Sequence, residues 1–260
     1  MDMRHIYIVG IGTGNPEHLT VQAINTLNKV DVIFIPSKGA AKAELAEVRR
    51  EICQRYVTKE TIRVVDYAVP VRQTTDRSYV QSVDDWHAEL SATYERLFQE
   101  HIPENGSAAF LVWGDPSLYD STIRIIERVS ARKRIALDYS VIPGITSIQA
   151  LTASHRIPLN LVGKPVQITT GRRLAESFPG MVETAVVMLD GEQAFSKIDD
   201  PDAYIYWGAY LGTEDEITIA GRLADVSDRI VATRAEARAR HGWIMDIYLL
   251  RKGQDFDDQA

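Results

Sequence analysis

The sequence predicts an α/β protein of two domains, with a mainly parallel sheet in the N-terminal domain and a mixed sheet in the C-terminal domain. Two observations lead to this fold class. Up to Pro158, short β-branched runs alternate with amphipathic segments of about 10–15 residues, which is typical of strands joined by crossover helices. After Pro158, strand-like runs follow one another with fewer long helices between them. A chain of 260 residues is long enough for two such domains.

The expected elements of the first half follow from the period of its apolar residues. Strands are expected where β-branched and aliphatic residues run together, over 6–9, 32–35, 62–69, 108–112 and 137–142. Helices are expected from Thr20 onward, with Val21, Ile24 and Leu27 on one face, and then over 41–56, around 86–97 and over 122–131. This strict alternation favours a helix-covered parallel sheet.

The second half gives weaker signals. Strands are expected over 166–170, 185–189, 204–207, 230–233 and 245–250. Gly163 and Pro165 suggest a linker, so a domain boundary is placed near 159–165. The predicted domains are therefore residues 1–160 and 165–252, followed by a frayed polar tail over 253–260.

Charge and composition exclude several classes of protein. The chain has 29 basic and 36 acidic residues, a formal charge of −7, which disfavours binding to nucleic acid or to an anionic membrane. Cys53 is the only cysteine, so neither a disulfide framework nor a cysteine zinc site is available. No apolar run approaches the roughly 18 residues of a membrane span, and the N-terminus lacks a signal-peptide core. A cytoplasmic protein is expected.

A glycine-rich segment follows the first strand, over residues 9–16. A dinucleotide fingerprint would need glycine in place of Asn15 and an acid at the end of the second strand, where the chain has Pro36 and Ser37. A Rossmann-type methyltransferase would normally have an acid at Ile8. By itself, the segment is equally compatible with a ligand loop and with a plain strand-to-helix turn.

Two further loops combine glycine, proline and polar residues at strand ends. Residues 113–119 contain Gly114, Asp115 and Pro116, and residues 143–147 begin with Pro143 and Gly144. Taken singly, Asp115 could simply bind nearby backbone N–H groups, and the hydroxyls of the second loop could simply cap a helix. Taken together, three such loops at the carboxyl ends of strands indicate a ligand-binding edge, as in other open α/β sheets.

The order of these motifs resembles the tetrapyrrole methylases, class III methyltransferases that use S-adenosylmethionine (SAM). The similar segments are the Gly-rich loop 10–20, the Gly-Asp-Pro loop 114–119, the Pro-Gly loop 143–147, Ile-Pro-Leu at 157–159, and the stretches 186–190, 212–216 and 221–223. Four residues differ from the family pattern: Thr13 replaces proline, Asn15 aspartate, Asp190 glycine and Glu216 glutamine. Within the family, the chain most resembles a corrin-branch enzyme that methylates a ring carbon and releases acetate.

This resemblance implies a SAM site in a cleft between the two domains. The implied cofactor contacts are Thr13, Trp113, Gly114, Asp115, Leu118, Thr146 and Ser147 from the first domain, and Leu189 and Gly212 from the second. Asp115 and Tyr119 are the candidate catalytic residues for acetate release, although the sequence does not distinguish a base from a positioning group. No metal is required, and a homodimer is implied by the family alone.

A tetrapyrrole substrate carries many carboxylates, so a negatively charged protein needs a local basic patch to bind it. Arg156 and Arg172 are the candidates, whereas the run 132–134 is expected to be a solvated loop at the other edge of the sheet. Three alternatives remain open: a related enzyme acting on a different ring carbon, a relative that modifies rRNA or protein, and a catalytically silent nucleotide-binding regulator. The acidic charge argues against rRNA.

Overall fold

The chain forms two compact units, Met1–Ile145 and Thr146–Ala260, in a computed structural model that describes residues 3–37, 43–71, 79–177 and 183–252. The division lies earlier than the boundary predicted near 159–165. Helix α5 (Ser147–His155) packs against strands of the second unit and so belongs to it. This is why the division falls before α5 and not after it. The predicted tail over 253–260 lies outside the described residues.

The first unit is built on a parallel sheet of five strands. These strands are β1 (Arg4–Gly10), β2 (Val32–Ser37), β3 (Arg63–Ala68), β4 (Ser107–Val112) and β5 (Leu137–Ile142). They lie in the order β3-β2-β4-β1-β5, and every neighbouring pair is parallel. Both the mainly parallel sheet and its strand segments are thus confirmed.

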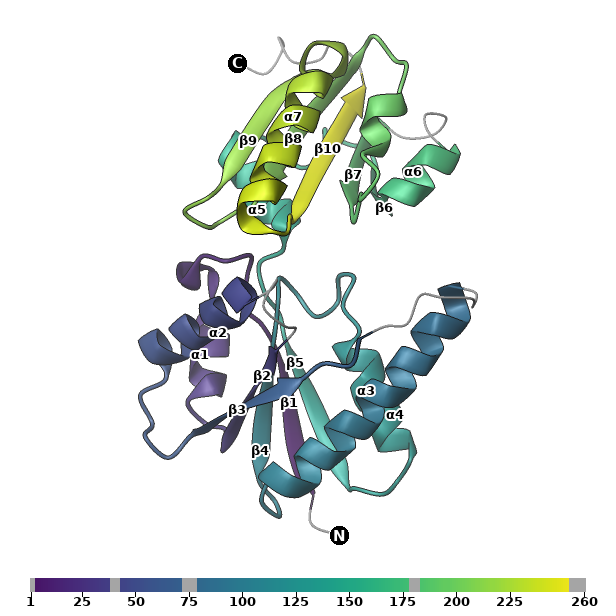
Figure 1. Ribbon diagram of the computed structural model, residues 1–260. Coiled ribbons are helices and arrows are strands. Elements are labelled where there is room, and N and C mark those ends of the chain that lie inside the picture. The colour runs from purple at the N-terminus through teal and green to yellow at the C-terminus, as the bar shows by residue number, and fades with distance from the viewer. Residues whose placement is uncertain (1–2, 38–42, 72–78, 178–182, 253–260) are drawn as a thin grey trace. The chain divides into compact units, whose positions relative to one another are not determined.

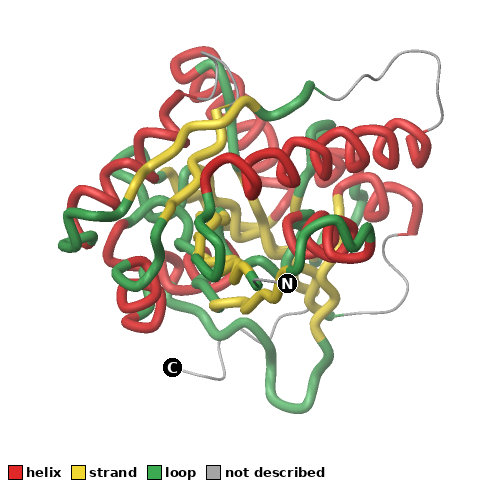
Figure 2. The backbone as a smooth tube through the Cα atoms, turned by 90° about the horizontal axis from the view of Figure 1, so that it is seen from below, coloured by secondary structure: helices red, strands yellow, loops and turns green. Residues whose placement is uncertain are grey.

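Helices cover both faces of this sheet (Figures 1 and 2). They are α1 (Val21–Leu27), α2 (Ala43–Tyr56), α3 (Tyr79–His101) and α4 (Thr122–Ala131), with a 3-10 turn at Pro16–His18. The side chains of β4 show how the faces are divided. Ala108 and Phe110 join the core under α3 and α4, whereas Ala109 and Leu111 join the core under α1 and α2. The period of two along the strand therefore builds two separate cores.

The face predicted for α1 is wrong in one respect. Val21 is 73% exposed, and the buried stripe consists of Ala23, Thr26 and Leu27. Thr20 explains the difference, because its hydroxyl accepts a hydrogen bond from the Ala23 N–H and begins the helix at Val21. The i, i+3, i+4 spacing of the buried residues then turns Val21 toward solvent.

The second unit contains a mixed sheet, as predicted. Its strands are β6 (Val166–Thr170), β7 (Thr184–Met188), β8 (Ala203–Ala209), β9 (Ile217–Arg222) and β10 (Asp246–Lys252). The order is β6-β7-β10-β8-β9, in which only β6 and β7 pair in parallel. Helix α6 (Gly171–Ser177) packs on β6 and β7, and α5 packs on β8 and β10.

The strand predicted over 230–233 is wrong, because these residues lie inside α7 (Leu223–His241). Ile230 and Val231 suggest a strand locally, but the buried positions Leu223, Ile230, Arg234 and Ala237 recur at helical spacing. The flanking alanines, arginines and acids also favour a helix. The true neighbouring strand, β9, was not predicted.

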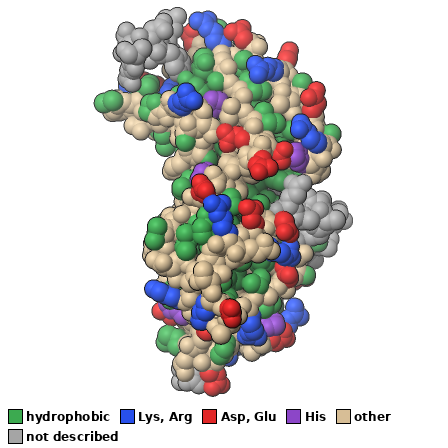
Figure 3. Space-filling model, turned by 90° about the vertical axis from the view of Figure 1, so that its left-hand side faces the viewer, with side chains coloured by type: hydrophobic (Ala, Val, Ile, Leu, Met, Phe, Trp, Pro, Cys, Tyr) green, Lys and Arg blue, Asp and Glu red, His purple; other side chains and the backbone are tan. Residues whose placement is uncertain are grey.

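Acidic and basic side chains are interspersed on the face of each unit that Figure 3 shows. Among the described residues, no helix is both long and apolar enough to cross a membrane.

Candidate functional site

Topology brings three predicted loops of the first unit together. Strand β1 lies between β4 and β5, and all three run in the same direction. Their carboxyl ends therefore meet at one edge of the sheet, where open α/β sheets bind ligands. The loop after each strand is one of the three that were singled out by their glycines.

The loops after β1 and β4 are hydrogen-bonded to each other. The Gly114 N–H donates to the Gly12 carbonyl at 2.7 Å, and the Gly12 N–H donates back to the Gly114 carbonyl at 3.3 Å. Both glycines have positive φ, +77° for Gly12 and +68° for Gly114, a conformation that side-chain-bearing residues rarely adopt. Glycine is thus what allows this exchange of hydrogen bonds.

Gly10 and Gly144 bring the third loop into the same contact. A Cβ on Gly144 would lie 2.2 Å from the Gly114 carbonyl oxygen and 2.8 Å from the backbone of Gly10. A Cβ on Gly10 would lie 2.6 Å from the Gly144 nitrogen. The backbones of all three loops therefore touch, with no room for a side chain.

Asp115 ties this arrangement together. One carboxylate oxygen, Oδ2, accepts the Gly144 N–H at 2.8 Å, and Oδ1 accepts the Ser117 N–H at 2.8 Å and the Ser117 hydroxyl. Partial burial opposes ionisation, but these hydrogen bonds outweigh it and lower the pKa of Asp115 below its usual value. Both oxygens are thus engaged by the protein itself, as expected of a group that positions loops.

The other candidates of the first unit differ in exposure. Thr13 is buried, with its hydroxyl 3.5 Å from Nδ1 of His18, while Trp113 and Leu118 are half-buried. Tyr119 is 48% exposed and has a φ of +52°. A left-handed conformation is energetically unfavourable for an aromatic residue. Residues held in such conformations are common at functional sites.

Sequence reasoning missed Arg49, which approaches the same edge from α2. Its Nε donates to the Leu111 carbonyl at 3.0 Å, and its guanidinium lies over the Trp113 ring, 5.9 Å from the centroid. Burial lowers the pKa of Arg49. Arg49 therefore links the end of β4 to the Trp113 ring, and no periodic or motif signal in the sequence marks it for this contact.

In the second unit, the structure brings Arg172, Leu189 and Gly212 to one edge. Strands β6, β7 and β8 share one direction, because β6 is parallel to β7, while β7 and β8 are each antiparallel to β10. The three residues follow the carboxyl ends of these strands. Leu189 is 66% exposed and has a φ of +54°, and the Gly212 N–H donates to Oε2 of Glu216 at 2.7 Å.

Thr146 and Ser147 begin α5. The Thr146 hydroxyl oxygen accepts the Ile148 N–H at 3.1 Å, and the Gln149 side chain accepts the Thr146 N–H at 3.1 Å. This is a capping box, so the capping considered from the sequence is present. Both residues are half-buried.

Arg156 is an exposed residue at the C-terminal end of α5. It follows His155, whose ring lies 5.3 Å from that of Tyr206, and the carbonyl of Pro158 accepts a hydrogen bond from Arg251 near the end of β10. Since β10 is antiparallel to β8, this end of β10 lies at the edge opposite Gly212. The residues that follow Arg156 therefore run to the edge opposite Gly212 and Arg172.

Arg132 lies where the sequence placed it, between α4 and the amino end of β5. It is exposed and pairs with Glu95 at 3.1 Å. Among the described residues, no group of three or more histidine, cysteine or acidic side chains is arranged to hold a metal ion.

The chain is similar to known proteins over nearly its whole length. The family model of the tetrapyrrole (corrin/porphyrin) methylases matches residues 5–227. A precorrin-6A synthase (deacetylating) from a Sinorhizobium species is 69% identical over 256 residues, covering 98% of each chain.

Solved structures extend the comparison to three dimensions. A cobalamin-synthesis-related protein from Corynebacterium diphtheriae superposes with a TM-score of 0.83 at 40% identity, covering 96% of this chain and 99% of that one. A uroporphyrin-III C-methyltransferase from Thermus thermophilus, complexed with S-adenyl homocysteine, gives a TM-score of 0.57 at 19% identity, covering 95% and 97%. The second likeness concerns the fold alone.

Proposed function

Because the chain belongs to the family of tetrapyrrole (corrin/porphyrin) methylases, we propose that it is a SAM-dependent C-methyltransferase of cobalamin biosynthesis. It methylates C1 of precorrin-5 and releases acetate, which gives precorrin-6A. The observation that carries this assignment is the 69% identity to a deacetylating precorrin-6A synthase over 98% of both chains. Identity at this level over the whole length leaves little room for a different acceptor.

The loops of the first unit suit a methyl donor of this kind. Gly10, Gly12, Gly114 and Gly144 let the three loops pack closely, backbone against backbone, and this packing fixes the positions of the loop residues proposed to contact the donor. The proposed donor contacts from this unit are Thr13, Trp113, Gly114, Asp115 and Leu118. From the second unit they are Thr146, Ser147, Leu189 and Gly212.

Methyl transfer from SAM mainly requires that the protein position the two reactants. SAM supplies a methyl group that is already activated by its sulfonium, so neither a covalent nucleophile nor a metal is needed for the transfer. The chain's own residues bind the reactants, orient them and exclude water. We assign Asp115 to positioning, since both its oxygens hold the loops, and Tyr119 to the acetate-releasing step, since its phenol is exposed beside them.

Incubation of the protein with SAM and precorrin-5, followed by mass spectrometry, tests this function directly. We expect the product to gain one methyl group and lose one acetyl group. Methyl gain on a different precorrin, with precorrin-5 unchanged, would instead identify an enzyme acting on another ring carbon. In parallel, calorimetry should show S-adenosylhomocysteine binding with a Kd of about 1 μM, or roughly −8 kcal/mol. No binding would contradict the methyltransferase assignment itself.

Replacing Arg172 by alanine should raise the KM for the tetrapyrrole about tenfold to a hundredfold and leave S-adenosylhomocysteine affinity nearly unchanged. The reason is the loss of about 1–3 kcal/mol from a charge-assisted contact to a substrate carboxylate. High salt should shrink the effect, because an exposed pair is screened. Steady-state kinetics at two ionic strengths would measure both.

Two other arginines provide the comparison. Arg156→Ala should raise KM less than Arg172→Ala, since the residues that follow Arg156 run to the edge opposite Arg172. Arg132→Ala should change neither constant. An Arg132 variant as impaired as the Arg172 variant would mean that the substrate binds at the amino edge of the first sheet.

We propose further that the enzyme is a cytoplasmic homodimer that binds no nucleic acid. The family resemblance supports the dimer, and the net charge of −7 supports the last point. Light scattering of the purified protein would measure the oligomeric state.

A further inference from the structure

Leu189 is held in an unusual state at the end of β7. Its φ of +54° lies in the left-handed region, which a leucine rarely adopts, and 66% of its surface is exposed. Packing of the leucine's own side chain therefore does not compensate for the unfavourable conformation. Glycine at this position would avoid the strain, which makes the leucine side chain itself a candidate for contact with a ligand.

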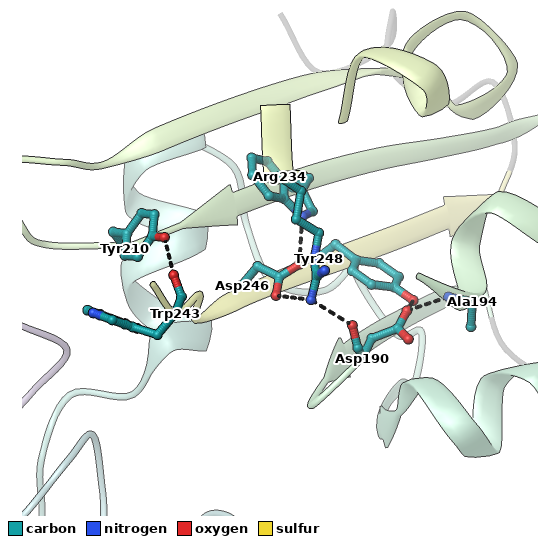
Figure 4. Close-up of polar contacts among 8 residues, drawn as sticks. Asp190, Ala194, Tyr210, Arg234, Trp243, Asp246 and Tyr248 are labelled. Atoms are coloured by element: carbon teal, nitrogen blue, oxygen red, sulfur yellow. Dashed lines mark hydrogen bonds and ion pairs between the residues drawn. The ribbon is translucent and has the colours of Figure 1, made fainter. Parts of the chain in front are cut away.

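The next residue, Asp190, is buried and held from several directions (Figure 4). Its Oδ2 accepts the Tyr248 hydroxyl at 2.6 Å and the Ala194 N–H at 2.7 Å. Its backbone carbonyl accepts a hydrogen bond from Arg234 at 3.3 Å. Gly171 packs so closely that a Cβ there would lie 2.2 Å from Oδ1 of Asp190. Strand β10, helices α6 and α7 and the turn at Ala194 thus all fix this one residue.

The partners of Asp190 are themselves fixed. Nε of Arg234 donates to Oδ2 of Asp246 at 2.9 Å, and the Trp207 indole N–H donates to the same oxygen at 3.1 Å. Burial raises the pKa of Tyr248, and its hydrogen bond to Asp190 raises it further, so its hydroxyl stays protonated and remains a donor. The whole network is buried, which makes each hydrogen bond costly to lose.

We infer that Asp190 is a positioning residue, which holds Leu189 in its left-handed conformation so that the leucine side chain contacts the methyl donor. The inference rests on the proposed function for the identity of the ligand. It assigns a purpose to the carboxylate that stands where the family pattern has glycine. Asp190 itself touches no ligand; it fixes the backbone that carries Leu189.

A double-mutant cycle with S-adenosylhomocysteine as the probe tests this coupling. Asp190→Asn keeps the shape but replaces one acceptor oxygen by a donor. We expect it to lower both the melting temperature and the affinity, the latter about tenfold. Leu189→Ala should lower the affinity by a similar factor. In the double variant the affinity should fall no further than in Leu189→Ala alone, because Asp190 acts through the leucine.

Two further variants separate positioning from stability. Leu189→Gly relieves the strain, so it should melt at or above the wild-type temperature and yet bind the probe at least tenfold more weakly. Ile205→Val, in the core of the same unit, should lower the melting temperature without changing the affinity.

The outcomes are distinguishable. Failure of the wild-type protein to bind S-adenosylhomocysteine would contradict the proposed function, and with it the ligand named here. Normal binding by wild type together with unchanged affinity in Asp190→Asn would overturn the inference alone. So would additive losses of affinity in the double variant, or a change of oligomeric state in Leu189→Ala with no change of affinity.

Discussion

Replacing Gly144 by alanine should force the three loops of the first unit apart. The new Cβ would lie 2.2 Å from the Gly114 carbonyl oxygen, and this neighbour is backbone that cannot rotate away. Overpacking of this kind costs about 1–3 kcal/mol of unfolding free energy. For a chain of this size that corresponds to a fall in melting temperature of roughly 2–12 °C. Affinity for S-adenosylhomocysteine should fall at least tenfold, and calorimetry would measure both quantities.

Gly191→Ala is the matched control, because a Cβ on Gly191 meets no atom within 4 Å. Gly10→Ala should resemble Gly144→Ala, since the two backbones press on each other. Combined, the two substitutions should cost less than the sum of the single effects, because loops already separated by one Cβ accommodate the second. Wild-type stability and affinity in Gly144→Ala would contradict the close packing of the loops.

The elements of the first unit were predictable because local and global signals agree there. Each strand contains aliphatic or β-branched residues and ends near glycine or proline, so composition and punctuation agree on where the strands lie. The helices agree less well, because α1 buries another face than predicted and α3 is longer than the segment around 86–97. In helix α7 the local and global signals disagree. Ile230 and Val231 favour a strand locally, and only the spacing of Leu223, Ile230 and Ala237 over many residues reveals the helix.

The candidate site was predictable only as a set of loops. Which loops meet follows from strand order, and glycine marked them in the sequence. The role of Asp115 depends on a hydrogen bond to Gly144, 29 residues away, and no local pattern encodes that partner. The course of the chain after Arg156 likewise depends on how β8 and β10 pair, which the weak strand signals of the second half did not specify.

Replacing Asp115 by asparagine should weaken the binding of S-adenosylhomocysteine about tenfold to a hundredfold. The amide keeps one acceptor oxygen for the Gly144 N–H but presents an NH₂ group to the Ser117 N–H, two donors facing each other. The loss corresponds to about 1.4–2.7 kcal/mol, in the range of a broken hydrogen bond to a charged group. Ser117→Ala, which removes only the hydroxyl contact to Oδ1, should have a smaller effect.

The products formed by Asp115→Asn decide between a positioning group and a general base. A positioning role predicts that methylation and acetate release fall together, along with cofactor affinity. A base specific to acetate release predicts a methylated product that retains its acetyl group, with normal affinity for S-adenosylhomocysteine.

The pH dependence of the rate provides a second test of the role of Asp115. The pKa of Asp115 is lowered in the folded protein, so its contribution to stability is complete above the ordinary pKa of 3.8 and is lost only as the pH falls through the lower folded value. The wild-type rate should therefore show no ionisation of Asp115 near neutral pH. An ionisation near neutrality that disappears in Asp115→Asn would instead identify Asp115 as the base.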